Sequence, residues 1–170
     1  MSNSKNKISK LFSLSINEYR ILLKSWLLYA KWDWRVSKQD YKKWQKHIIS
    51  QPLSPLNETH QSANISNVSN TSDTASMNKI LILIQLNEMA GRNHYKHMNC
   101  LRRCLSQKEL LNSFNIETKL HLGVKFVEGK LAAHSWLSSN NQIINDSAEV
   151  ISTYQELKTL NDQSTLALLK

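Results

Sequence analysis

The sequence predicts an α+β protein in which a helix that begins with a cysteine packs on a small antiparallel sheet. Two observations lead to this prediction. Leu101, Cys104 and Leu105 form an apolar face at helical spacing directly after Cys100. Residues 118–127 then alternate between apolar and polar side chains, which is typical of a half-buried strand. Further helices are expected ahead of this core.

Residues 1–50 are expected to form an N-terminal helical segment. Ser15 and Glu18 have the spacing of a capping box, and apolar side chains follow at helical spacing over residues 19–30. A second helix is expected over residues 38–49. Because four of the five tryptophans lie here, we interpret the helices as packing on the core. The alternative is a docking face for a partner protein, since Trp and Tyr are common interface anchors.

Residues 51–77 change in composition and are expected to be a disordered linker. Pro52 and Pro55 end the preceding helix. The following residues are rich in Asn, Ser and Thr and offer almost no apolar surface to bury. Residues 78–170 then form the predicted core domain.

The core is expected to begin with a helix over residues 78–90, with Gly91 as the residue just past its end. The cysteine-bearing helix follows over residues 99–113. Its N-cap is expected to be Asn99, whose side chain can accept a free backbone N–H group.

The strands are expected to pair antiparallel because the connections between them are short. They are predicted at residues 118–127, 131–137 and 142–145. A final helix is expected over residues 146–160, where Asp146 and Glu149 have capping-box spacing.

Length, charge and cysteine content limit the functional classes. The chain has 170 residues and a net charge of +9, enough for one domain with a core. Cys100 and Cys104 stand one helical turn apart, so a disulfide between them would stabilise little. The first residues are polar and basic, without the apolar stretch of a signal peptide. The sequence therefore predicts a reduced, cytoplasmic protein without a membrane span.

The basic residues do not point to a particular partner. They are scattered, and the modest cluster at residues 38–46 is interpreted as a solvated face, so no nucleic-acid partner is predicted. No second Cys/His pair has zinc-binding spacing, and no P-loop is present. We therefore expect no metal and no cofactor.

Cys100 is a candidate nucleophile because the start of a helix favours a thiolate. His134 in the second strand and Asp146 at the end of the third can lie side by side. These residue types suit acyl transfer: Cys100 attacks, His134 transfers protons, and Asp146 orients the imidazole. The backbone N–H of Cys100 would bind the oxyanion, and Gln85 is a possible second donor. The structural alternatives are a small core cysteine, a half-buried histidine and a helix-capping aspartate.

Four short segments carry a family resemblance: Cys100-Leu101, Leu122-Gly123-Val124, Ala133-His134-Ser135-Trp136 and Ile143-Ile144-Asn145-Asp146. In this order they resemble the leader peptidases of lasso peptide biosynthesis, in the transglutaminase-like branch of the papain-type fold. The resemblance covers roughly residues 78–157 and implies a Cys100, His134 and Asp146 triad. Ser135 stands where the family usually has Ala. Cys104 stands where Ser is common and is expected to pack in the core.

The resemblance also implies an activity and partners. The protein would be a cysteine protease that removes the leader peptide from a lasso peptide precursor and passes the product to a macrolactam cyclase. Because residues 1–50 lack β-hairpin signals, the leader would be recognised by a separate protein. ATP would enter only through such partners. The alternatives are a transglutaminase-like acyltransferase or amidase on the same triad, and a non-enzymatic peptide-binding module that uses the Trp-rich helices.

The sequence also predicts the locations of four other tryptophan and histidine side chains. Trp136 is expected in the core beneath the site, and His121 on the solvent-exposed side of the first strand. His94 and His97, in the loop before Cys100, are weaker candidates for lining a substrate groove.

Overall fold

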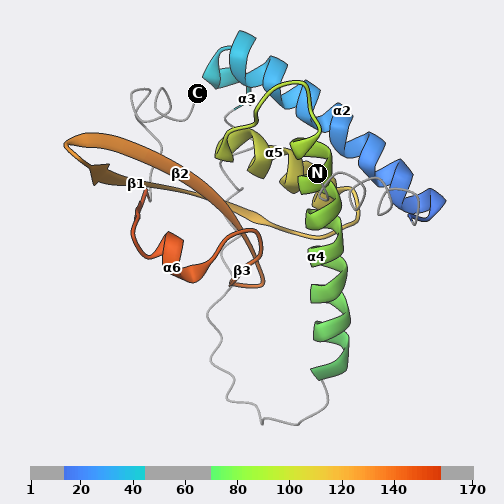
Figure 1. Cartoon of the computed structure of the whole chain (residues 1–170). Helices are drawn as coiled ribbons and strands as arrows, with labels where there is room; N and C mark the ends of the chain where they lie inside the picture. Colours follow the sequence, from blue (N-terminus) through green and yellow to red (C-terminus); the bar gives the residue numbers. More distant parts are fainter. Residues whose placement is uncertain (1–13, 45–69, 158–170) are drawn as a thin grey trace, which may run out of the picture.

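The computed structural model describes residues 14–44 and 70–157. Figure 1 shows α5 between α2 and the curled β1–β2 hairpin, with α4 alongside. This arrangement confirms the predicted α+β class. In chain order the elements are α2 (Ile16–Lys38), α3 (Tyr41–Trp44), α4 (Asn70–Arg92), α5 (Cys100–Asn112), β1 (Lys119–Val127), β2 (Lys130–Ser139), β3 (Gln142–Ile143), α6 (Ala148–Ile151) and β4 (Gln155–Glu156).

The sheet is antiparallel and has the order β3-β2-β1-β4. The long hairpin turns at Glu128 and Gly129, whose φ angles of 50° and 76° suit the twist of a tight hairpin. Its register places Gly123 of β1 directly opposite His134 of β2. The antiparallel pairing that the short connections predicted is therefore confirmed.

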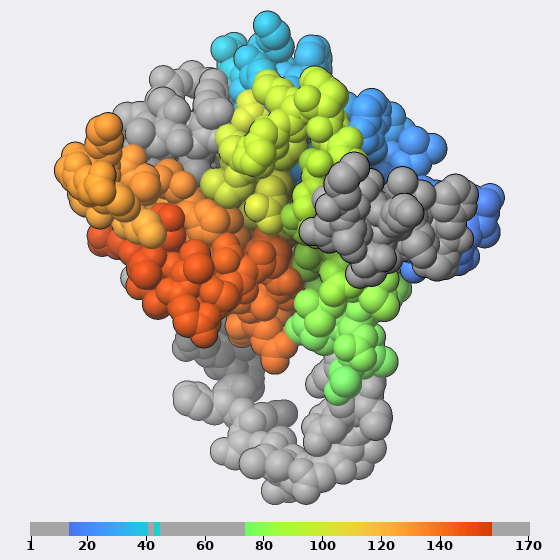
Figure 2. Space-filling model, viewed as in Figure 1, coloured from blue at the N-terminus to red at the C-terminus, as the bar shows by residue number. Residues whose placement is uncertain are grey.

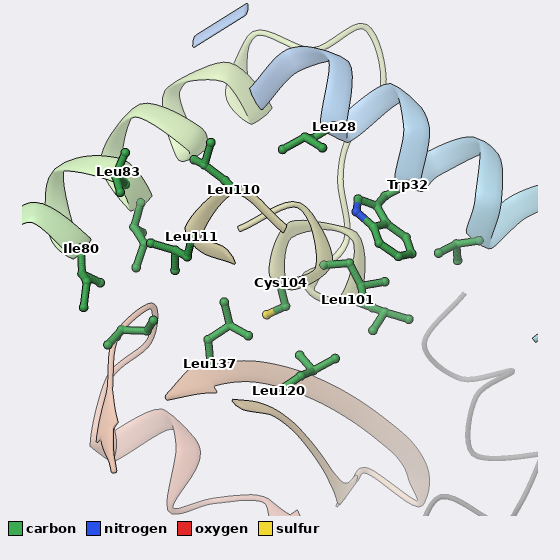
Figure 3. Close-up of a cluster of buried hydrophobic side chains, with 14 of the residues drawn as sticks. Leu28, Trp32, Ile80, Leu83, Leu101, Cys104, Leu110, Leu111, Leu120 and Leu137 are labelled. Atoms are coloured by element: carbon green, nitrogen blue, oxygen red, sulfur yellow. The ribbon is translucent and has the colours of Figure 1, made fainter. Parts of the chain in front are cut away.

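One core cluster joins the helices to the sheet. In Figure 3, Leu101 and Cys104 of α5 lie between Trp32 of α2 on one side and Leu120 and Leu137 of the sheet on the other. Burying each such large apolar side chain contributes about 1.5–3 kcal/mol. Because it is packed on both sides, α5 is held firmly at the centre of the molecule.

The N-terminal helices belong to this same core. Trp32 and Trp44 are each only 1% exposed, whereas Trp26 and Trp34 are 38% and 58% exposed. The Ser15–Glu18 capping box forms as predicted. Packing on the core is thus confirmed for the described part of the segment.

Several predicted boundaries differ from the observed ones. Because α2 continues through Lys38, the second helix starts later than predicted, at Tyr41. Residues 45–49 of that prediction lie outside the described residues. Residues 70–77 of the predicted linker are the first turns of α4. The remainder of the linker, residues 51–69, also lies outside the described part.

Gly91 lies inside α4, which runs to Arg92, so its prediction as the residue past the helix end is wrong. Its lack of a side chain serves a close approach instead. A Cβ atom at this position would lie 2.7 Å from the Oη atom of Tyr29. Tyr29 is 0% exposed, which leaves its ring no space to move away.

Replacing Gly91 with alanine should therefore destabilise the protein by about 1–3 kcal/mol, the usual effect of overpacking a core. Urea unfolding followed by circular dichroism measures the change. At an unobstructed helix position the same substitution should stabilise by about 1 kcal/mol. A gain in stability would contradict the proposed contact with Tyr29.

The predicted final helix over residues 146–160 is wrong for residues 146–157, and residues 158–160 lie outside the described residues. The structure has the short α6, whose N-cap is Ser147 rather than Asp146, followed by β4. β4 pairs with the edge of β1, and the N–H of Leu157 donates to the carbonyl of Leu122 at 2.8 Å. Pairing with a free strand edge outweighs the local helical pattern here. The third strand is also shorter than predicted, ending at Ile143.

Candidate active site

Cys100 is the first residue of α5 and is partly exposed. Asn99 caps the helix as predicted, with its Oδ1 atom accepting the N–H of Arg102 at 3.1 Å. An ion pair between Arg102 Nε and Asp33 Oδ1, at 2.8 Å, fixes this end of α5 to α2. The thiol therefore lies at a firmly held helix start, where the helix dipole favours negative charge.

His134 of β2 interacts with both of the other predicted site residues. Its Nε2 atom lies 2.5 Å from Oδ2 of Asp146. The thiol of Cys100 lies near enough to the imidazole for each group to shift the pKa of the other. Because Nε2 faces the carboxylate, Nδ1 is the ring nitrogen left for the thiol. The second carboxylate oxygen of Asp146 accepts the N–H of Ser147 at 2.8 Å, so Asp146 helps to orient α6 without capping it.

The environment moves the pKa values of Cys100 and His134 in opposite directions. Burial alone would raise the pKa of the Cys100 thiol, but hydrogen bonds from His134 and Ser135 and the charge of His134 outweigh burial and lower it. The hydrogen bond with Cys100 raises the pKa of His134; burial opposes this effect and Asp146 reinforces it. Both shifts favour a thiolate beside an imidazolium.

Cys104 has a different environment from Cys100, although it lies on the same helix. It is 2% exposed and belongs to the core cluster, as predicted. Its S–H donates to the carbonyl of Ser135 at 3.2 Å. Burial raises the pKa of its thiol to about 12. Cys104 is therefore neutral and inaccessible near neutral pH.

Aromatic rings hold the imidazole of His134 in place. The ring of Trp136, which is buried as predicted, stacks on it at 6.2 Å between centroids, and that of Tyr154 lies at 5.1 Å. Gly123 makes room for both, since a Cβ there would lie 2.8 Å from the Trp136 ring and 2.9 Å from the Tyr154 Cβ atom. Sequence reasoning missed Tyr154 because it assigned that segment to a helix.

The prediction that His121 is solvent-exposed is wrong. Its side chain is only 13% exposed and contacts Oε1 of Glu156 through Nδ1 at 2.6 Å. Its Nε2 atom lies 2.6 Å from the hydroxyl of Ser138, and its ring stacks on Trp136. The addition of β4 to the sheet edge brings Glu156 to this position, which the chain order alone did not reveal.

The weaker candidates lie elsewhere. His94 packs against the rings of Trp26 and Tyr95, with centroids 5.2 Å and 4.4 Å away. His97 is exposed in the loop before α5, and Gln85 is exposed on α4. The role of Gln85 as the second oxyanion donor stays a prediction.

The candidate site lies where the helical half of the molecule, which includes α4 and α5, meets the half formed by the β1–β2 hairpin and the residues after it. In Figure 2 the hairpin and the residues after it, in orange and red, adjoin α4 and the segment leading into α5, in green. Cys100 comes from the helical half, and His134 and Asp146 come from the other half. Among the described residues, no His, Cys, Asp and Glu side chains form a group of three or more that could hold a metal ion.

Comparison with known proteins identifies the family. A family model described as the transglutaminase-like superfamily matches residues 53–159, which is more than half of the chain. The chain belongs to the transglutaminase-like superfamily. The match includes Cys100, His134 and Asp146, and the α+β architecture fits this family. Searches of curated proteins and of solved structures gave no match.

Family membership sets the class of chemistry. The transglutaminase-like superfamily usually acts through a catalytic cysteine, which suggests an activity of the cysteine protease or acyltransferase type for this transglutaminase-like protein. In the described part of the chain, no helix combines the length and apolar character needed to cross a bilayer.

Proposed function

We propose that this transglutaminase-like protein is a cysteine peptidase that removes the leader peptide from a lasso peptide precursor. Cys100, His134 and Asp146 are its catalytic triad. The observation that carries the proposal is the 2.5 Å contact between His134 and Asp146, next to a thiol at a helix start whose pKa His134 lowers. The short motifs around these residues support the choice of a lasso peptide precursor as the substrate.

The proposed reaction passes through an acyl-enzyme. The Cys100 thiolate attacks the scissile carbonyl carbon, and the backbone N–H of Cys100 donates to the oxyanion. The imidazolium of His134 gives its proton to the leaving amine as the C–N bond breaks. His134 then removes a proton from water, whose oxygen attacks the thioester; the C–S bond breaks, the carboxylic acid is released, and the thiolate–imidazolium pair is restored. Asp146 keeps the imidazole oriented through Nε2 in both steps.

The proposed partners follow from this activity. The precursor leader is the substrate, a separate protein recognises the leader, and a macrolactam cyclase consumes the product. In the described part of the N-terminal segment, α2 packs on the core with one face and exposes large apolar side chains, such as Leu23, Leu27 and Trp34, on the other. This exposed face is the proposed docking surface for the recognition protein.

Mass spectrometry of a candidate precursor incubated with the full chain and a candidate recognition protein tests the activity. The expected result is a fragment whose mass equals the precursor without its leader, in the presence of the wild-type chain but not of Cys100→Ala. Transfer of the acyl group to an added primary amine, without hydrolysis, would instead establish the transglutaminase-like alternative. The family match itself keeps that alternative open, because both reactions share the acyl-enzyme.

The pH dependence of Cys100 alkylation tests the proposed thiolate–imidazolium pair without any substrate. The pKa of Cys100 is lowered and that of His134 is raised, and both directions favour the ion pair over the neutral pair. An ordinary thiol, with a pKa of about 8.5, is almost wholly protonated at pH 6. We expect Cys100 to react with iodoacetamide at pH 6 at least about tenfold faster than a free thiol, as measured by peptide mass spectrometry.

Cys104 is the internal control for this experiment, because its raised pKa and burial should prevent its modification over the same range. A Cys100 profile that rises only near pH 8.5, as for a free thiol, would contradict the ion pair.

A further inference from the structure

Asn145 directly precedes Asp146, and its side chain makes hydrogen bonds in two directions. Its Oδ1 atom accepts the backbone N–H of Leu137 in β2 at 2.7 Å. Its Nδ2 atom donates to Oε1 of Gln107 at 2.7 Å and to Sγ of Cys104 at 3.3 Å. Gln107 and Cys104 both belong to α5. The side chain of Asn145 therefore joins the Asp146 segment to the helix that begins with Cys100.

The carboxylate of Glu88 fixes the orientation of the side-chain amides of Gln107 and Asn145. Glu88 of α4 can only accept hydrogen bonds, and its Oε1 atom lies 2.6 Å from Nε2 of Gln107. Gln107, which is 0% exposed, must therefore present its oxygen to Asn145. Asn145 then presents its NH₂ group to Gln107 and its oxygen to Leu137. Each amide has one satisfied arrangement, so the bridge is rigid.

The backbone near Asp146 has few other attachments. β3 ends at Ile143, and the last backbone hydrogen bond to β2 is from the N–H of Ile144 to the carbonyl of Leu137, at 3.0 Å. At the next residue, the side chain of Asn145 accepts the backbone N–H of Leu137 in place of a backbone carbonyl. Asp146 follows immediately, and its carboxylate meets His134 on the neighbouring strand.

We propose that Asn145 is a positioning residue, whose amide bridge to α5 sets where the carboxylate of Asp146 meets the imidazole of His134. This inference rests on the proposed function of the triad. The bridge fixes the position of Asp146 relative to α5, and therefore to Cys100, through contacts that do not involve His134. Cys100 begins α5, and Gln107 lies on the same helix.

The variant Asn145→Ala in the full chain tests the proposal through the pH profile of Cys100 alkylation by iodoacetamide. Without the bridge the Asp146 segment shifts, the imidazolium loses its orienting partner, and the thiolate loses stabilisation at acidic pH. A misplacement of about 1 Å can lower reactivity on the order of 100-fold. We expect the alkylation rate at pH 6 to fall by about 10- to 100-fold, with the midpoint of the profile moving toward that of a free thiol.

A double-variant comparison shows whether Asn145 acts through Asp146. In the Asp146→Asn background, Asn145→Ala should cause little further change in the profile, because the two substitutions remove the same effect. Fully additive effects of the two substitutions would overturn the proposal.

Asn87→Ala is the matched control. Asn87 is a fully buried asparagine, whereas Asn145 is partly buried, and the Nδ2 atom of Asn87 donates to the hydroxyl of Ser106 at 3.0 Å, joining α4 to α5. Both alanine variants should lower the melting temperature, but only Asn145→Ala should change the profile. If Asn145→Ala fails to fold, Gln107→Met removes the same bridge at similar volume and should move the midpoint in the same direction.

The results separate this inference from the proposed function. A wild-type profile that resembles a free thiol would refute the triad. A wild-type profile with high reactivity at pH 6 that is unchanged in Asn145→Ala and Gln107→Met would leave the triad standing and overturn the positioning role of Asn145.

Discussion

Replacing Cys100 with alanine should abolish leader cleavage, whereas replacing Cys104 with serine should leave most of it. Removal of a catalytic nucleophile lowers turnover on the order of 10⁴- to 10⁶-fold. Cys100 is the partly exposed thiol at the helix start, and its pKa is lowered despite burial by its interaction with His134. The rate of product formation by mass spectrometry measures the effect.

The Cys104→Ser variant is the matched control because it changes a thiol on the same helix. A serine hydroxyl can still donate to the carbonyl of Ser135, as the thiol of Cys104 does. Burying the more polar group should reduce stability by about 1–2 kcal/mol without changing the thiolate. Equal losses of activity in both variants, at a temperature where both are folded, would assign no special role to Cys100.

Asp146→Asn should lower turnover by about 10²- to 10⁴-fold while changing the melting temperature little. The asparagine retains an oxygen for the N–H of Ser147 but can present an N–H group toward Nε2 of His134, which disfavours the imidazolium and the required tautomer. Steady-state turnover and thermal unfolding, measured on the same preparation, separate the two effects.

Ser147→Ala is the comparison variant, in which stability should fall while turnover stays normal. Ser147 is the N-cap of α6 and accepts the N–H of Val150 at 3.3 Å. Its loss should reduce stability by about 0.5–2 kcal/mol and leave turnover close to that of the wild type. A large stability loss with normal specific activity in Asp146→Asn would instead make Asp146 a structural residue.

The parts of the fold that depend on local chemistry could be predicted from the sequence. Asn99 as the cap of α5, the capping box at Ser15 and the alternation in β1 each depend on residues within a few positions of one another. These features placed Cys100 at a helix start and His134 on a strand. The contact between His134 and Asp146 was expected because their strands are neighbours in sequence.

The parts that depend on distant contacts could not be predicted. β4 forms because the edge of β1 is available, and this pairing replaced the expected final helix. The same pairing brings Tyr154 next to His134 and Glu156 next to His121. Gly91 was assigned from a local rule, whereas its role depends on the ring of Tyr29 in another helix. The bridge of Asn145 to Gln107 likewise requires the relative placement of a helix and a loop.

The short strand β4 has a consequence for the direction from which a peptide can arrive. It occupies the edge of β1 at Gly123 and Val124, so a substrate cannot extend the sheet there by backbone hydrogen bonds. Tyr154 closes the same approach to the imidazole, and the amine of Lys125 lies 4.2 Å from the centre of its ring. A polypeptide truncated before Tyr154 would present a bare strand edge and become prone to self-association. Residues 154–157 thus cover this edge of the sheet and exclude strand addition as the mode of peptide binding there.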